Sequence, residues 1–187
     1  LLNQTIKTST EAFEKFDYTQ ALDQTETLFW EFCDHYIELV KVRAYRETDI
    51  KKKQSALATL DLALSNFLKL LAPFLPYITE EIWSWRYQLD EKSIHIQSWP
   101  TPTTLESENP DIFKQTALLM SLIRGEKTKH QKSLKHPIES IEIHCNSSQQ
   151  NYFERALNDI KQTASIGQLS FHTADSLSQV ITFSETE

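Results

Sequence analysis

The chain has 187 residues and a formal net charge of -7, and hydrophobic residues make up 40% of it. The negative charge argues against a protein whose main function is strong, nonspecific nucleic-acid binding, because phosphate contacts need clustered Lys and Arg. The two glycines, Gly125 and Gly167, are too few for a glycine-rich phosphate loop or a dinucleotide-binding fingerprint, and they favour a mostly helical chain.

The N-terminal part, residues 1–89, is predicted to be helical. A first helix covers residues 2–16, and Asp17 followed by Gln20 predicts an N-cap pair that starts a second helix near Tyr18. This second helix keeps one apolar face until about Tyr45, where residues 47–49 break the pattern. We interpret the start of the sequence as lying inside a helix of a longer protein, since no initiator Met or signal-like segment precedes it.

A third helix carries leucines at helical spacing from Leu57 to Leu71, and the prolines of APFLP (residues 72–76) must end or kink it. A fourth helix is predicted to run to about Leu89. Four helices with short connections indicate an antiparallel bundle.

The pattern changes after the fourth helix. Residues 93–100 alternate in polarity, which indicates a short strand or an extended link, and the proline-rich stretch 101–110 reads as a linker. Beyond it we expect a helix over 111–129, a strand over 138–145, a helix over 149–164 and strands over 168–172 and 179–183. The predicted fold class is mainly α: an antiparallel helical bundle (1–100), a linker (101–110) and a small α+β subdomain (111–187).

The stretch FWEFCDHYIELVKVRAY, residues 29–45, has two contrasting sides. At about 100° per residue, the apolar side opposes a polar line with spacings of four, three and four residues. That line consists of Asp34, Glu38, Lys41 and Tyr45. The simplest reading is a solvated face with a weak Glu38–Lys41 pair. The functional alternative is a polar platform edged by aromatic rings, which would bind unstacked bases.

A second candidate surface is basic and lies in the tail. Its members are Arg124, Lys127, Lys129, Lys132 and Lys135, with His130 and His136, and only Glu126 opposes them. The cluster suits a phosphate backbone, and it equally fits a solvated helix end with cations near its C-terminus.

Catalytic and metal-binding patterns are weak. The six histidines show no metal-ligand spacing, so no metal site is predicted. Cys33 falls on the apolar stripe and points away from His35, which favours a buried structural thiol over a nucleophile. Cys33 and Cys145 occupy unlike contexts, which indicates a reduced, cytoplasmic protein, although a disulfide between them stays open.

Several blocks resemble the anticodon-binding region of valyl-tRNA synthetases. FDYTQAL (16–22) and FWEFCDHYIELVK (29–41) are similar to its first blocks, LAPFLPYITEEIW (71–83) to the next, and SIH (93–95) with WP (99–100) to the last. The resemblance covers residues 1–100 strongly. The tail looks like a small α+β extension found in some valyl enzymes, and the heptads of a coiled-coil arm do not occur in it.

The resemblance implies a parent class I ligase that joins valine to tRNA(Val) with ATP. The family's catalytic signatures, His-x-Gly-His and Lys-Met-Ser-Lys-Ser, do not occur in this sequence, so the chain alone is expected to be inactive and to need no cofactor of its own. Its expected partners are the anticodon stem-loop of tRNA(Val) and the remaining domains of the parent synthetase, with no membrane.

The resemblance also implies that both candidate surfaces contact tRNA. Arg43 and Arg46, which lie near the polar line of residues 34–45, would contact phosphates. The predicted tRNA-binding residues are Asp34, Glu38, Lys41, Arg43, Tyr45, Arg46, Arg124, Lys127 and Lys132. Three alternatives remain: the equivalent domain of an isoleucyl or leucyl synthetase, a structural module that braces the parent enzyme, and a hydrolase that uses Cys33 or a carboxylate pair.

Overall fold

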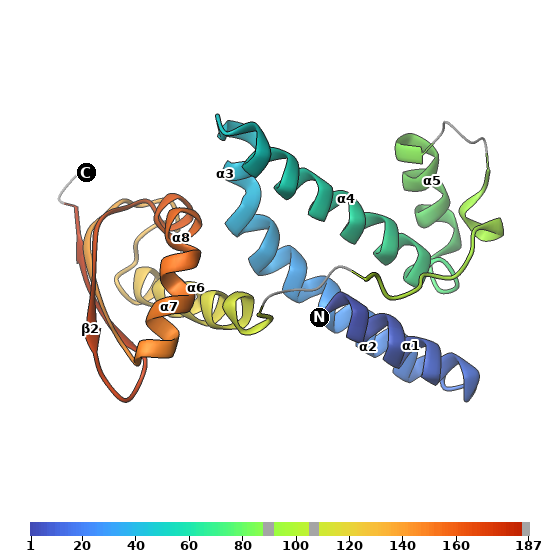
Figure 1. Ribbon diagram of the computed structural model, residues 1–187, viewed down its shortest axis with the longest axis horizontal. Helices are drawn as coiled ribbons and strands as arrows, with labels where there is room; N and C mark the ends of the chain where they lie inside the picture. The colour runs from blue at the N-terminus through green and yellow to red at the C-terminus, as the bar shows by residue number, and fades with distance from the viewer. Residues whose placement is uncertain (88–91, 105–108, 185–187) are drawn as a thin grey trace. The chain divides into compact units, whose positions relative to one another are not determined.

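The computed structural model describes residues 1–87, 92–104 and 109–184 and divides into two compact units (Figure 1). Unit 1 comprises Leu1–Asp34 and Thr48–Glu106, and unit 2 comprises His35–Glu47 and Ser107–Glu187. The described part is mainly helical and carries a small three-stranded mixed sheet, which confirms the predicted fold class.

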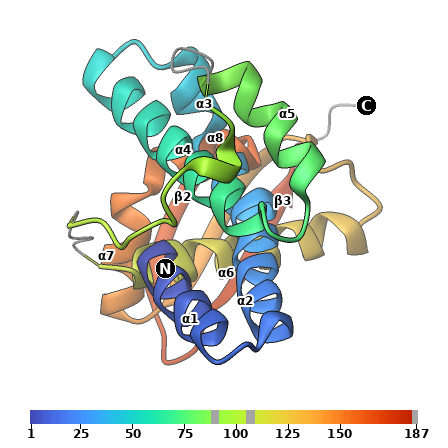
Figure 2. The same cartoon turned by 90° about the vertical axis from the view of Figure 1, so that its right-hand side faces the viewer.

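Unit 1 begins with a helical hairpin. Helices α1 (Leu2–Glu14) and α2 (Tyr18–Glu31) lie side by side in both Figure 1 and Figure 2. The turn between them places Phe16 at a φ of 60°, and the predicted cap is present, because the Asp17 carboxylate accepts a hydrogen bond from the Gln20 amide at 3.0 Å. The helices approach each other through buried hydroxyls, with Ser9 and Thr25 oxygens 3.2 Å apart.

Helices α4 (Ile50–Leu71) and α5 (Pro76–Tyr87) complete the helical part of unit 1. The break falls at the predicted prolines, and the predicted end of the last helix near residue 89 lies outside the described residues. Two apolar clusters hold these helices. One is formed by Leu28, Ala63 and Phe67, and the other by Leu68, Ala72, Trp83 and Ile94.

The segment after α5 is not a strand. Residues Ile94–Ile96 form a short 3-10 helix, η3, capped by the Ser93 hydroxyl, which accepts a hydrogen bond from the His95 amide at 3.1 Å. The alternation that suggested a strand has another cause: Ile94 is buried under α5, whereas Ile96 is 71% exposed.

The predicted helix over residues 18–45 contains a change of helix type. Phe32–Ile37 form a π-helix, η1, between α2 and α3 (Glu38–Arg46). The division into units falls inside η1, so residues 35–47 group with the C-terminal unit and not with the predicted 1–100 bundle. The reason is packing: the apolar face of α3 lies against α8 of unit 2. The later boundary, after residue 106, falls within the predicted linker.

Unit 2 combines helices with the sheet. Its elements are α6 (Asp111–Lys129), β1 (Ile138–Cys145), α7 (Ser147–Arg155), α8 (Leu157–Ala164), β2 (Ile166–Thr173) and β3 (Ser178–Phe183). The strand order is β2-β1-β3, with β2 parallel and β3 antiparallel to β1. The helix predicted over 149–164 is two helices that meet at Ala156.

The central strand has one buried and one solvated face. Ile141, Ile143 and Cys145 alternate into the core, while Glu142 on the other face is exposed. Figure 1 shows α7 and α8 on one side of the sheet, so a single layer of helices covers the apolar face.

Candidate nucleic-acid interface

Helix α3 is anchored in unit 2 by its apolar face. Leu39, Val40 and Ala44 are buried, and α8 lies against them. The Thr163 hydroxyl of α8 donates a hydrogen bond to the backbone carbonyl of Glu38 at 3.1 Å. The backbone of α3 is therefore fixed, which gives its opposite face a defined geometry.

The opposite face of α3 carries the residues predicted to meet RNA. Tyr45 is 81% exposed and Arg46 is also exposed. Lys41 pairs with the carboxylate of Glu38 one turn earlier, and both side chains remain partly exposed. Glu38, Lys41, Tyr45 and Arg46 form what we call the α3 face. It offers an aromatic ring for stacking, two cations for phosphates and one carboxylate acceptor.

Asp34 and Tyr36 belong to η1, where the α-helical extrapolation fails. A π-helix bonds residue i to i+5 and so has more residues per turn than an α-helix. The predicted straight line from Asp34 to Tyr45 is therefore interrupted. Asp34 is exposed and is the last residue of the first segment of unit 1. Tyr36 is half-buried, with its ring 5.8 Å from that of Phe113 in unit 2, which agrees with a packing role.

Arg43 does not lie free for phosphates. Its guanidinium pairs with Asp159 of α8 at 2.9 Å, and both side chains are largely shielded. Because the pair joins α3 to α8 within unit 2, we assign Arg43 to packing and leave it out of the proposed interface.

The three predicted tail residues differ in their surroundings. Lys132 is exposed, and Arg124 is half-buried with its Nη1 3.5 Å from Nδ1 of His35. Lys127 is 1% exposed, so it cannot touch RNA in this fold. Its ammonium donates to the carbonyls of Leu134 and Ala164, each at 2.9 Å, and burial lowers its pKa.

The burial of Lys127 had a signal in the sequence. Lys127 follows Met120 and Ile123 at spacings of seven and four residues, so it continues the buried stripe of α6. The position of Lys127 on the helix therefore predicts burial, whereas its residue type alone predicts a surface cation.

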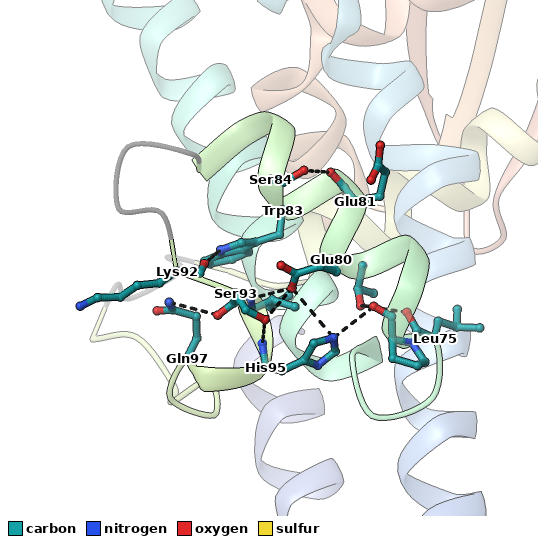
Figure 3. Close-up of polar contacts among 12 residues, drawn as sticks. Leu75, Glu80, Glu81, Trp83, Ser84, Lys92, Ser93, His95 and Gln97 are labelled. Atoms are coloured by element: carbon teal, nitrogen blue, oxygen red, sulfur yellow. Dashed lines mark hydrogen bonds and ion pairs between the residues drawn. The ribbon is translucent and has the colours of Figure 1, made fainter.

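Glu80 has a structural role that sequence reasoning missed. Figure 3 shows its carboxylate facing the segment after α5. It accepts hydrogen bonds from the Ser93 hydroxyl at 2.8 Å and from the Ile94 amide at 3.0 Å, and His95 Nε2 lies 3.9 Å away. Glu80, the first glutamate of LAPFLPYITEEIW, thus binds the SIH block. The presence of both blocks in the sequence was the signal that could have predicted this contact.

The Glu80 cluster contains a serine, a histidine and a carboxylate, but its geometry is not that of a hydrolase triad. The Ser93 hydroxyl donates to the carboxylate and not to an imidazole nitrogen. His95 Nε2 lies 3.2 Å from the Pro76 carbonyl. Because the Ser93 hydroxyl donates to a weakly basic carboxylate and not to an imidazole, the Ser–His pairing that activates a triad serine does not form here.

Cys33 is a poor nucleophile for the same alternative. Burial, followed by the nearby charge of Asp34, raises the pKa of its thiol, which disfavours the reactive thiolate. Cys33 and Cys145 are both free thiols. Within the residues that the structure describes, no three His, Cys, Asp or Glu side chains gather to hold a metal ion.

Comparison with known proteins defines the class. The model of the family "Anticodon-binding domain of tRNA ligase" matches residues 1–143, and the chain belongs to this family. Membership implies tRNA binding. Across the described ranges, the structure offers no helix of sufficient length and apolar character to cross a membrane.

The relatives narrow the class to valyl-tRNA ligase-like proteins. The chain is 47% identical over 142 residues to a valine–tRNA ligase of Tropheryma whipplei (strain Twist), covering 76% of this chain and 16% of that protein. It is 34% identical over 179 residues to the valine–tRNA ligase of Thermobifida fusca (strain YX), covering 94% and 20%. That of Cutibacterium acnes is 37% identical over 175 residues, covering 92% and 20%. The chain thus spans at most a fifth of these three relatives.

Proposed function

We propose that the α3 face binds the anticodon stem-loop of tRNA(Val), within a larger ligase that joins valine to this tRNA with ATP. One observation carries the proposal: Tyr45 is 81% exposed on a helix whose other side is buried against α8. An exposed aromatic ring on a fixed backbone is a stacking platform for an unpaired base, a contact worth about 1–3 kcal/mol.

Each member of the α3 face has a distinct proposed role. Lys41 and Arg46 would contact phosphates, and Glu38 would accept hydrogen bonds from a base edge. Asp34, an exposed carboxylate of unit 1, is a separate proposed acceptor. Arg124 and Lys132 are proposed contacts to the RNA backbone. The chain would act through the helical unit 1 and through unit 2, which includes α3, beside the remaining domains of the ligase.

The test is fluorescence anisotropy of the 187-residue chain with a tRNA(Val) transcript at low salt. A second transcript differs in the middle and third anticodon bases. We expect tighter binding to the valine anticodon, and we expect Tyr45→Ala to weaken it about tenfold, the loss of a stacking contact of this size. Tyr77→Ala is the matched control, since Tyr77 is 91% exposed in unit 1 and outside the proposed interface.

The outcomes separate the proposal from its alternatives. Binding that ignores the anticodon would remove the base-reading role. Preference for an isoleucine or leucine transcript would assign the chain to a sister ligase. A chain that binds no transcript would support the bracing module, a reading consistent with the use of Arg43 and Lys127 inside unit 2.

A further inference from the structure

The loop between α6 and β1 is a dense cluster of positive charge in an acidic chain. Residues 130–137 read HQKSLKHP and contain no acidic residue. Lys132 and Lys135 are both exposed, and Lys129 precedes them at the end of α6, where it pairs with Glu126 at 2.6 Å. We call residues 129–136 the basic loop.

The basic loop is held in one conformation by backbone hydrogen bonds. The Lys132 amide donates to the Lys127 carbonyl at 2.8 Å, and Gln131 takes a φ of 54°. The His136 amide donates to the Ser133 carbonyl at 2.9 Å. A loop fixed in this way loses little conformational entropy when it binds a ligand.

Side chains secure the two ends of the loop. The ring of Phe183, on β3, lies 5.3 Å from the His130 ring and 5.9 Å from the His136 ring. His136 Nε2 also lies 3.2 Å from the carbonyl of Ser184. The sheet edge thus braces the loop at both histidines.

Lys127 secures the loop from beneath. Its buried ammonium donates to the Leu134 carbonyl in the loop and to the Ala164 carbonyl, which closes α8. A helix C-terminus favours a cation, and this offsets part of the cost of burying the charge. Lys127 therefore ties the middle of the basic loop to the end of a helix.

We propose that the basic loop is a preformed binding surface for an RNA phosphate backbone, and that Lys127 is its positioning residue. The proposal rests on the proposed function, which supplies the RNA, and adds Lys135 to the contacts. Lysine ammoniums only donate hydrogen bonds, which suits phosphodiester oxygens, and contacts to phosphates carry no direct sequence information. The loop would add affinity without adding anticodon discrimination.

The first test removes the charges. Lys132→Gln with Lys135→Gln is compared with a control of equal charge change in the same unit, Lys114→Gln with Lys161→Gln. Binding of the chain to a tRNA(Val) transcript and to a plain RNA duplex is measured between about 50 and 200 mM salt. We expect the loop variant to bind both RNAs roughly tenfold more weakly, and its salt slope to fall by about 1 for each lysine. The control should retain the wild-type slope.

The second test concerns Lys127. Lys127→Met is measured alone and in the loop variant, with thermal unfolding as a check on folding. If Lys127 acts by positioning the two lysines, its effect on RNA affinity should vanish once they are absent. An effect of equal size in both backgrounds would overturn the positioning role. If the loop variant keeps the wild-type affinity and salt slope, the proposal that the basic loop binds the RNA backbone is wrong.

The two proposals fail separately. Loss of anticodon preference with retained loop-dependent duplex binding would sink the proposed function and leave the basic loop standing. If the chain prefers the valine anticodon but its RNA affinity does not depend on the loop lysines, the proposed function stands and the basic-loop proposal fails.

Discussion

The carboxylate of Glu80 accepts a hydrogen bond from the hydroxyl of Ser93 at 2.8 Å, and through it α5 holds the segment that follows. The same oxygen accepts the Ile94 amide, which points Ile94 into the core beside Trp83. The indole of Trp83 donates to the Lys92 carbonyl at 3.2 Å (Figure 3). Two distant sequence blocks are thus one packing unit.

Replacement of Glu80 should destabilise the chain. Glu80→Gln keeps the shape but loses the charged acceptor, so we expect a loss of about 1 kcal/mol in the free energy of unfolding, measured with urea. Glu81→Gln is the matched control. Glu81 is exposed and its carboxylate accepts from Trp85 of the same helix, so its loss should stay below about 0.5 kcal/mol. Equal losses would contradict the role given to Glu80.

Replacement of the two glycines by alanine should change the stability of the chain in opposite directions. A Cβ on Gly167 would lie 2.8 Å from the carbonyl oxygen of Glu139 on β1, so Gly167→Ala should cost about 1–3 kcal/mol. A Cβ on Gly125 meets nothing within 4 Å, and α6 gains helix propensity, so Gly125→Ala should stabilise by up to about 1 kcal/mol. Thermal unfolding of both variants checks the pair, and a stabilising Gly167→Ala would refute the predicted clash.

The two thiols should label slowly and in a fixed order. Burial raises the pKa of both above the ordinary 9.0, and Cys145 is 1% exposed whereas Cys33 is half-buried. Cys33 should therefore react first with a disulfide reagent, at a rate that still climbs above pH 9.0. Asp34→Asn removes a charge that raises the Cys33 pKa, so it should speed Cys33 and leave Cys145 unchanged. Faster labelling of Cys145 would contradict the burial described.

Lys127 should give stability a distinct pH dependence. Burial puts its pKa in the folded chain below the ordinary 10.5, so between these values the unfolded chain binds more protons and stability rises with pH. Below that window the cost of the buried charge is fully present. The stability of wild type relative to Lys127→Met should therefore increase as the pH rises toward 10.5, with a slope of at most about 1.4 kcal/mol per pH unit. Urea unfolding measures it, and a difference that stays constant would contradict the lowered pKa.

Local patterns predicted most elements because they act over a few residues. The alternation in 138–145 and the apolar stripe in 111–129 gave β1 and α6 with the observed ends. The Asp17 cap and the proline break after α4 follow the same logic. Two features were not predicted: no local pattern marked the π-helix η1, and the polar–apolar alternation at residues 94–96 reflects the packing of Ile94 under α5 and not a strand. The apolar stripe of α6 did indicate a buried position for Lys127, but the two carbonyls that accept from its ammonium lie seven and 37 residues away.

The exposure of the candidate residues could be predicted only in part. Lys41 and Tyr45 have partly exposed and exposed side chains on α3, as the helical wheel indicated. Arg43 lies two residues from Lys41 and pairs with Asp159, a partner that no spacing rule could supply. Charge alone does not distinguish a cation that meets solvent from one that joins two helices.

The grouping of residues 35–47 with the C-terminal unit limits how this protein can be divided. A truncated chain that starts at the linker would lack α3, so the apolar side of α8 would meet water and Asp159 would lose Arg43. A chain that stops at residue 100 would keep α3 but lose α8, against which the apolar face of α3 packs. Either fragment should aggregate or unfold in part, because each would expose apolar side chains that α3 and α8 bury against each other.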